Sequence, residues 1–161
     1  MDLQEIKKIY PEAVALVGMA ESVWYGNTQA ARIDFSLSDR LKAELKKLLG
    51  KNIESIFVTD SDVKHIKKKH GQKEALRGQV DITPADFALI PFVMNEFDTA
   101  EHTGTDKLGN KKITFTKNTG ETVFTVSVER GNNQIGVITL WKRKPARVPS
   151  ADSGNPPPPL A

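Results

Sequence analysis

Three strand-like segments follow one another closely near the end of the chain, and they constrain the fold more than any other feature. They cover residues 112–117 (KITFTK), 121–129 (ETVFTVSVE) and 134–141 (QIGVITLW), and all are rich in β-branched and aromatic residues. The connections, 118–120 (NTG) and 131–133 (GNN), consist of residues that favour tight turns. Strands joined by such short turns pair antiparallel, so the sequence predicts an antiparallel meander.

The residues before this meander carry patterns typical of helices. The expected helices cover 2–10, 11–24 and 36–50, and two short strand-like runs, 31–36 and 53–58, lie among them. Helices early in the chain and a meander late in it predict an α+β fold. We expect N-terminal helices packed against a C-terminal antiparallel β-sheet.

Two capping-box patterns predict where further helices begin. Thr59 with Asp62 starts one helix, which Gly71 should end, and Thr83 starts another. Pro91 is expected to end or bend that second helix. The segments expected to be polar connections are 72–82 and 98–110.

The domain organisation follows from these patterns and from composition. We expect an N-terminal helical segment over 1–30, one α+β domain over 31–147, and a Pro-rich disordered tail or linker over 148–161. The absence of cysteine excludes disulfides and thiolate metal sites. No apolar run is long enough to span a membrane, so a soluble protein without membrane partners is expected.

Basic residues are concentrated toward the end of the chain. The net charge is only +3, but residues 107–147 hold nine Lys or Arg against two Glu. Such a distribution favours a phosphate-rich partner. Lysines that merely keep a surface soluble would explain the same pattern.

His65 and His70 lie five residues apart in the lysine-rich stretch VTDSDVKHIKKKHG (58–71). On a helix this spacing turns the two side chains about 140° apart, whereas zinc-binding histidine pairs on helices usually lie four apart. No metal site is therefore predicted. We expect His65 to be the more exposed histidine and His70 to lie closer to the core. An ordinary surface residue and an ordinary packing residue remain alternatives for them.

Histidines among lysines suit metal-free cleavage of RNA. A base removes the proton of the 2′-hydroxyl, which attacks the adjacent phosphate, and an acid protonates the leaving 5′-oxygen. Histidine can serve in both transfers because it titrates near neutral pH. Lysines can stabilise the negative charge on the phosphorane. This chemistry requires no cofactor, and none is expected.

The order of the motifs resembles that of a known superfamily. The helix motif TDxxxxHIxxxH (59–70), the run ITPADFALIP (82–91) and the meander ending in Thr139-Leu140-Trp141 are similar to the phage barnase–EndoU–colicin–RelE-like nucleases. The resemblance covers roughly 53–147. It implies helices packed on a four-stranded antiparallel sheet and, usually, metal-independent cleavage of RNA.

The resemblance also implies which residues act. The catalytic candidates carried over by position are His65, His70, Lys117 and Thr139. The candidates for contacting RNA are Lys68, Lys69, Lys112, Arg130, Trp141 and Lys142. For the tryptophan a buried strand position is an alternative, because indole rings often fill the core. His102 is expected to lie in a solvated loop.

The partners that the resemblance implies are RNA, with tRNA among the candidates, and either a cognate immunity protein or a phage parent protein. Such a protein would be cytoplasmic, phage-associated or delivered into a target cell. Two competing functions are a non-catalytic binding module with the same fold and an ADP-ribosyl transferase. The transferase usually carries a Glu-x-Glu pair, which this sequence lacks.

Overall fold

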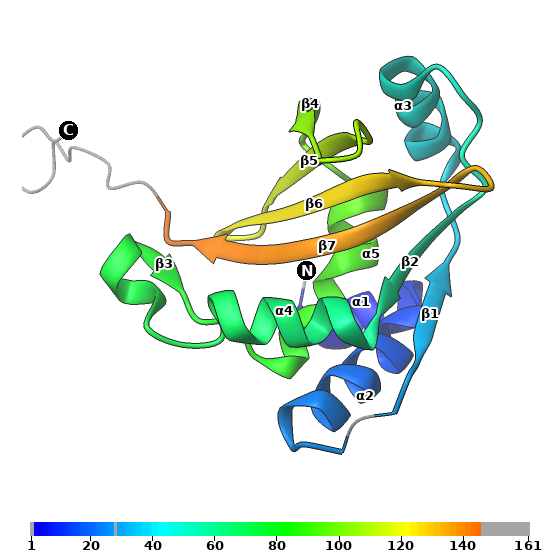
Figure 1. Cartoon of the computed structure of the whole chain (residues 1–161). Helices are drawn as coiled ribbons and strands as arrows, with labels where there is room; N and C mark the ends of the chain where they lie inside the picture. Colours follow the sequence, from blue (N-terminus) through cyan, green and yellow to red (C-terminus); the bar gives the residue numbers. More distant parts are fainter. Residues whose placement is uncertain (1, 28, 146–161) are drawn as a thin grey trace, which may run out of the picture.

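The computed structural model describes residues 2–27 and 29–145 (Figure 1). Its helices are α1 (Leu3–Ile9), α2 (Glu12–Trp24), α3 (Asp39–Leu49), α4 (Asp60–His70) and α5 (Leu89–Asn95), with two 3₁₀ helices, η1 (Glu74–Arg77) and η2 (Pro84–Ala88). Its strands are β1 (Arg32–Phe35), β2 (Ser55–Thr59), β3 (Gln79–Val80), β4 (Thr99–Thr105), β5 (Lys111–Asn118), β6 (Thr122–Arg130) and β7 (Gln134–Arg143). The tail expected over 148–161 lies outside the described residues.

One mixed sheet contains all seven strands, in the order β1-β2-β7-β6-β5-β4, and β3 also pairs with β7. The α+β class and the antiparallel meander β5-β6-β7 are confirmed. The expectation of a purely antiparallel sheet is wrong in one place, because β2 runs parallel to β7, with Ile56 opposite Ile135. Both isoleucines are buried, so this parallel pair contributes to the core.

Helix α4 fills a gap along one edge of β7. Strand β2 pairs with the beginning of β7 at Ser55, and β3 pairs with its end at Val80. Between these two pairings α4 contacts β7, and Figure 1 shows the helix running alongside that strand. Its buried residues Val63 and Ile66 hold it in place. The capping box of Thr59 and Asp62 is confirmed at its N-terminus.

The N-terminal helices share the hydrophobic core of the sheet. Ile6 of α1 and Leu16 of α2 are fully buried in the same cluster as Phe115 and Leu140. No helix of the described chain is long and apolar enough to cross a membrane. Through these buried residues α1 and α2 pack onto the rest of the described chain.

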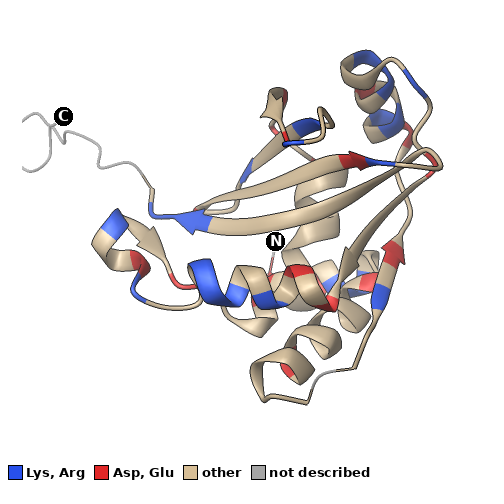
Figure 2. Cartoon of the chain, viewed as in Figure 1, with Lys and Arg blue, Asp and Glu red and all other residues tan. Residues whose placement is uncertain are grey.

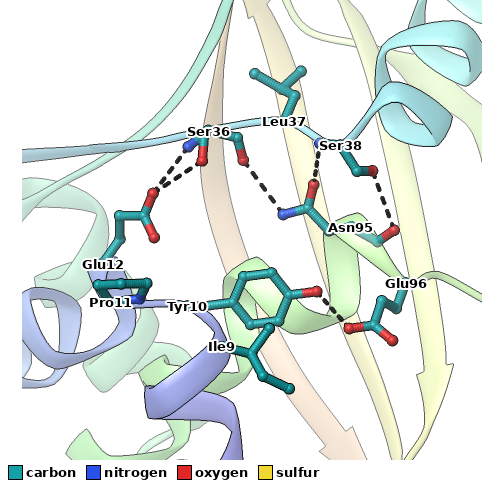
Figure 3. A pocket seen from close by; sticks show the side chains of 9 residues that line it. All are labelled: Ile9, Tyr10, Pro11, Glu12, Ser36, Leu37, Ser38, Asn95 and Glu96. Atoms are coloured by element: carbon teal, nitrogen blue, oxygen red, sulfur yellow. Dashed lines mark hydrogen bonds between the residues drawn. The ribbon is translucent and has the colours of Figure 1, made fainter.

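A polar network also ties these helices to the chain beyond them. It surrounds a shallow hollow of about 590 Å³ (Figure 3). There the Tyr10 hydroxyl donates to Glu96, while Glu12 accepts from the backbone and hydroxyl of Ser36. Burial, followed by the hydrogen bond to Glu96, raises the pKa of the Tyr10 hydroxyl. Because these groups satisfy one another, the network is explained by its role in packing.

Two local expectations are corrected. Residues 99–105 form the edge strand β4 rather than a loop, since their backbone pairs with β5 although most of their side chains are polar and exposed. Pro91 does not end a helix but lies in the first turn of α5, which continues to Asn95. A proline is tolerated there because the first turn of a helix needs no N–H donor.

Candidate active site

A hollow of about 610 Å³ opens between α4 and one face of the sheet. It is lined by Ser61, Asp62, His65, Lys69, His70, Thr103, Lys112, Val126, Ile138 and Thr139. We call the sheet face that carries Thr114, Val126 and Thr139 the outer face; these three residues lie opposite one another in register. Five of the predicted site residues therefore meet at one place.

A β-bulge shapes the sheet side of this hollow. Thr139 pairs with Val126 and Val137 pairs with Ser127, so Ile138 is an extra residue in β7. Consecutive residues of a regular strand point to opposite faces, but a bulge changes this alternation. As a result Ile138 and Thr139 both line the hollow, while Val137 is fully buried.

Helix α4 supplies the other wall. His65 and Lys69 are four residues apart and therefore lie on the same side of the helix. Both side chains are exposed. The Asp62 carboxylate takes part in the capping box of α4, where it accepts hydrogen bonds from the backbone N–H and the hydroxyl of Thr59. Figure 2 shows basic residues in the C-terminal half of α4 and at the end of β7, and also on α3.

His70 is fixed on two sides. Its Nδ1 lies 2.6 Å from Oε1 of Glu74, a carboxylate whose side chain is fully buried. Its ring stacks on Trp141 at 5.9 Å between centroids, and Trp141 stacks in turn on Phe124 at 4.7 Å. His65 differs, because no hydrogen bond to its imidazole is found in residues 2–27 and 29–145. The site thus contains one fixed and one exposed histidine.

Glu74 is a site residue that sequence reasoning missed. We expected 72–82 to be a polar connection, whereas it contains η1 and β3. The available signal was a glutamate four residues after His70. A spacing of four residues predicts a contact only within a continuous helix, and α4 ends at Gly71, between His70 and Glu74. The spacing therefore did not predict a contact between the two side chains.

Lys117, one of the four catalytic candidates, does not line the hollow that contains the other three. Its Nζ lies 3.2 Å from Asp98 and 5.6 Å from the ring centroid of Phe92, on the core side of the sheet. The pKa of the Asp98 carboxyl is lowered, chiefly because the backbone N–H of Asn118 donates a hydrogen bond to it. Desolvation opposes this effect, and the ammonium group of Lys117 adds to it. Lys112 is the lysine of β5 that lines the hollow.

The remaining basic candidates are dispersed. Lys142 is buried, with Nζ 3.0 Å from Asp86, so it is not placed to bind RNA. Lys68 lies in a different hollow, beside Trp24. Arg130 lies near the β6–β7 turn, 3.7 Å from Asp106. None of the three lines the α4 hollow.

The third histidine, His102, is not part of the hollow. It lies exposed on strand β4 rather than in a loop, and its Nε2 hydrogen-bonds the carbonyl of Gly104 at 2.8 Å. Within the part of the chain that the structure describes, no three His, Cys, Asp or Glu side chains are grouped so that they could hold a metal ion. The polar groups that line the hollow are two imidazoles, two ammonium groups, three hydroxyls and the Asp62 carboxylate. The cationic groups and the hydroxyls suit a phosphate group.

Comparison with known proteins shows that the part of the chain that forms the hollow matches a protein family. Residues 37–149 match the family described as phage-Barnase-EndoU-ColicinE5/D-RelE like nuclease3. The match begins earlier than the motifs used in the sequence analysis and includes every residue of the hollow. No curated protein and no solved structure matches the chain.

Proposed function

The chain belongs to the phage-Barnase-EndoU-ColicinE5/D-RelE like nuclease family, and on this basis we propose that it is a ribonuclease that needs no metal ion. One observation carries the proposal: His65, His70 and Lys112 line a single hollow although they come from a helix and a separate strand. Two proton-transfer groups and a cation suffice for metal-free cleavage of RNA by attack of the 2′-hydroxyl.

The reaction proceeds by transfer within the substrate. One histidine accepts the proton of the 2′-hydroxyl as the 2′-oxygen bonds to the adjacent phosphorus. The bond from phosphorus to the 5′-oxygen then breaks, and the other histidine donates the proton that this oxygen takes up. The products are a 2′,3′-cyclic phosphate and a free 5′-hydroxyl, so no water or cofactor is consumed.

Lys69 and Lys112 supply charge to this reaction from opposite walls of the hollow. Their ammonium groups bind the scissile phosphate, whose equatorial oxygens gain negative charge in the transition state. The Thr139 hydroxyl donates a further hydrogen bond from the bulged strand. Lys117, which faces the core side, has no part in the proposed mechanism.

RNA is proposed as the substrate because the attacking oxygen is the 2′-hydroxyl. The test uses short oligonucleotides that are all-deoxy except for one ribonucleotide. Cleavage should occur only on the 3′ side of the ribose. Equal cleavage of an all-deoxy strand would reject this mechanism, because DNA offers no internal nucleophile.

The family name motivates a wider role as a toxin-like effector of phage origin. An immunity protein or a phage parent protein would then be its protein partner, and tRNA one candidate substrate. The basic residues of the site would favour a protein partner with an acidic surface. Co-purification from cells that carry the neighbouring genes would test this.

A further inference from the structure

The side chain of Glu74 is fully buried in a short polar connection, where a solvated position would be expected. Burying a carboxylate is costly unless charged or hydrogen-bonding partners compensate. Two partners share it: Oε1 contacts Nδ1 of His70, and Oε2 pairs with Arg77. Both carboxylate oxygens are therefore in use, and one of them contacts a histidine of the candidate site.

The surrounding connection is built around this carboxylate. The backbone N–H of Glu74 donates to Asp81 at 2.9 Å, and Arg77 also donates to the carbonyl of Lys69 at 2.6 Å. The backbone N–H of Ile82 donates to the carbonyl of His70 at 2.8 Å. The chain thus leaves α4, turns, and returns to contact the last residues of that helix.

This contact determines which nitrogen of His70 carries the proton. A carboxylate has no proton to donate, so Nδ1 must be the donor. In the neutral ring Nε2 is then the free acceptor, on the side away from Glu74. Stacking on Trp141 restricts rotation of the ring. The contact with Glu74 and the stacking on Trp141 together favour one tautomer and one orientation of the imidazole.

We propose that Glu74 is a positioning residue of the nuclease: it holds His70 in the Nδ1–H form and leaves Nε2 for proton transfer in the hollow. This inference rests on the proposed function for its catalytic consequence, but the tautomer is a property of the protein alone. Carboxylates behind catalytic or metal-binding histidines commonly fix the tautomer in this way.

The first test is ¹⁵N NMR of the histidine side chains at a pH where the imidazoles are neutral. His70 should show a protonated Nδ1. His102 is the internal reference, because its Nε2 faces the carbonyl of Gly104 and should carry the proton. A protonated Nε2 on His70 in the wild-type protein would overturn the proposal whether or not RNA is cleaved.

The second test is Glu74→Gln, which keeps the size of the side chain. Arg77 can only donate, so the amide oxygen should face it and the amide NH₂ should face His70. Nδ1 must then accept, and the proton moves to Nε2. We expect kcat to fall about 10- to 100-fold, the range for such supporting groups, with KM little changed.

The double variant Glu74→Gln/Arg77→Met provides the rescue. Without Arg77 the amide can turn its oxygen toward Nδ1, so the Nδ1–H form and part of kcat should return. Arg77→Met alone should keep the wild-type tautomer. Thermal denaturation shows which variants are folded. If no variant folds, the NMR spectrum of the wild-type protein still determines the tautomer of His70.

The outcomes separate the two proposals. If the wild-type protein has the predicted tautomer but cleaves no RNA, the nuclease proposal fails and the contact stands. If folded Glu74→Gln cleaves RNA with the wild-type kcat, or the double variant restores neither tautomer nor kcat, the positioning role is overturned while the nuclease stands.

Discussion

Lys112 and Lys117 lie five residues apart on β5 and point to opposite faces of the sheet. Lys112 lines the hollow with both histidines of α4, whereas Lys117 pairs with Asp98 on the core side. An odd spacing on a regular strand always separates side chains in this way. The resemblance implies Lys117 as a catalytic candidate and Lys112 as a candidate for contacting RNA, whereas the structure places Lys112, and not Lys117, in the hollow.

The first prediction uses these two lysines. Lys112→Ala should lower kcat for RNA cleavage about 100-fold, because a cation beside the transition-state phosphate is lost. Lys117→Ala is the matched control on the same strand and should cleave at nearly the wild-type rate. The measurement is single-turnover cleavage of a fluorescent oligoribonucleotide. A loss in Lys117→Ala alone would place the site on the other face.

The second prediction concerns the histidines. His65→Ala should lower kcat about 100-fold or more, the usual loss when an acid or base is removed. Its melting temperature should stay near that of the wild type, because the side chain is exposed and forms no hydrogen bond among the described residues. His102→Ala, on β4, should change neither quantity. Equal activity of both variants would remove His65 from the mechanism.

The third prediction assigns Lys142 to stability. Its Nζ contacts Asp86 in a nearly buried ion pair, with side chains 11% and 10% exposed. Lys142→Met leaves Asp86 buried without its cation and should lower the free energy of unfolding by about 3 kcal/mol. Exposed Lys144→Met should cost close to nothing. Urea denaturation measures both, and a Lys142→Met protein of wild-type stability would contradict the prediction.

The fourth prediction concerns acid stability. Glu129 accepts hydrogen bonds from Lys51 and from the backbone of Lys111. Desolvation raises its pKa, but these contacts outweigh that effect and hold it below its ordinary value of 4.5. A lowered pKa gives stability that is complete above the unfolded-state value and disappears as the pH falls through the folded-state value.

Unfolding of Glu129→Gln should therefore depend less on pH than that of the wild type below about pH 4.5. Denaturant titrations at pH 3 to 7 measure this. Parallel pH curves for the two proteins would show that the carboxylate contributes nothing.

Local patterns predicted the elements that depend on neighbouring residues. The capping boxes at Thr59 and Thr83 fixed the starts of α4 and η2, because each uses side chains three residues apart. The meander followed from short turns between β-rich segments. Placing His65 nearer to solvent than His70 succeeded because helical periodicity fixes relative orientation.

The pairings between strands far apart in the chain were not predicted from the sequence. Strand β4 has no apolar alternation, since most of its side chains face water at the sheet edge. The parallel pairing of β2 with β7 joins segments nearly eighty residues apart, which no local pattern encodes. The bulge at Ile138 and the burial of Lys142 likewise depend on tertiary contacts. Strand alternation could have separated Lys117 from Lys112, but not shown which of them faces α4.

The most direct measurement is cleavage of RNA in EDTA by the wild-type protein and by His65→Ala, with the ends of the products identified. Wild-type protein should cleave RNA at the same rate with or without EDTA. The products should have 2′,3′-cyclic phosphate and 5′-hydroxyl ends, and His65→Ala should cleave at least about 100-fold more slowly. Failure of the folded wild-type protein to cleave varied RNAs, with or without added metal ions, would contradict the account and favour a binding module instead.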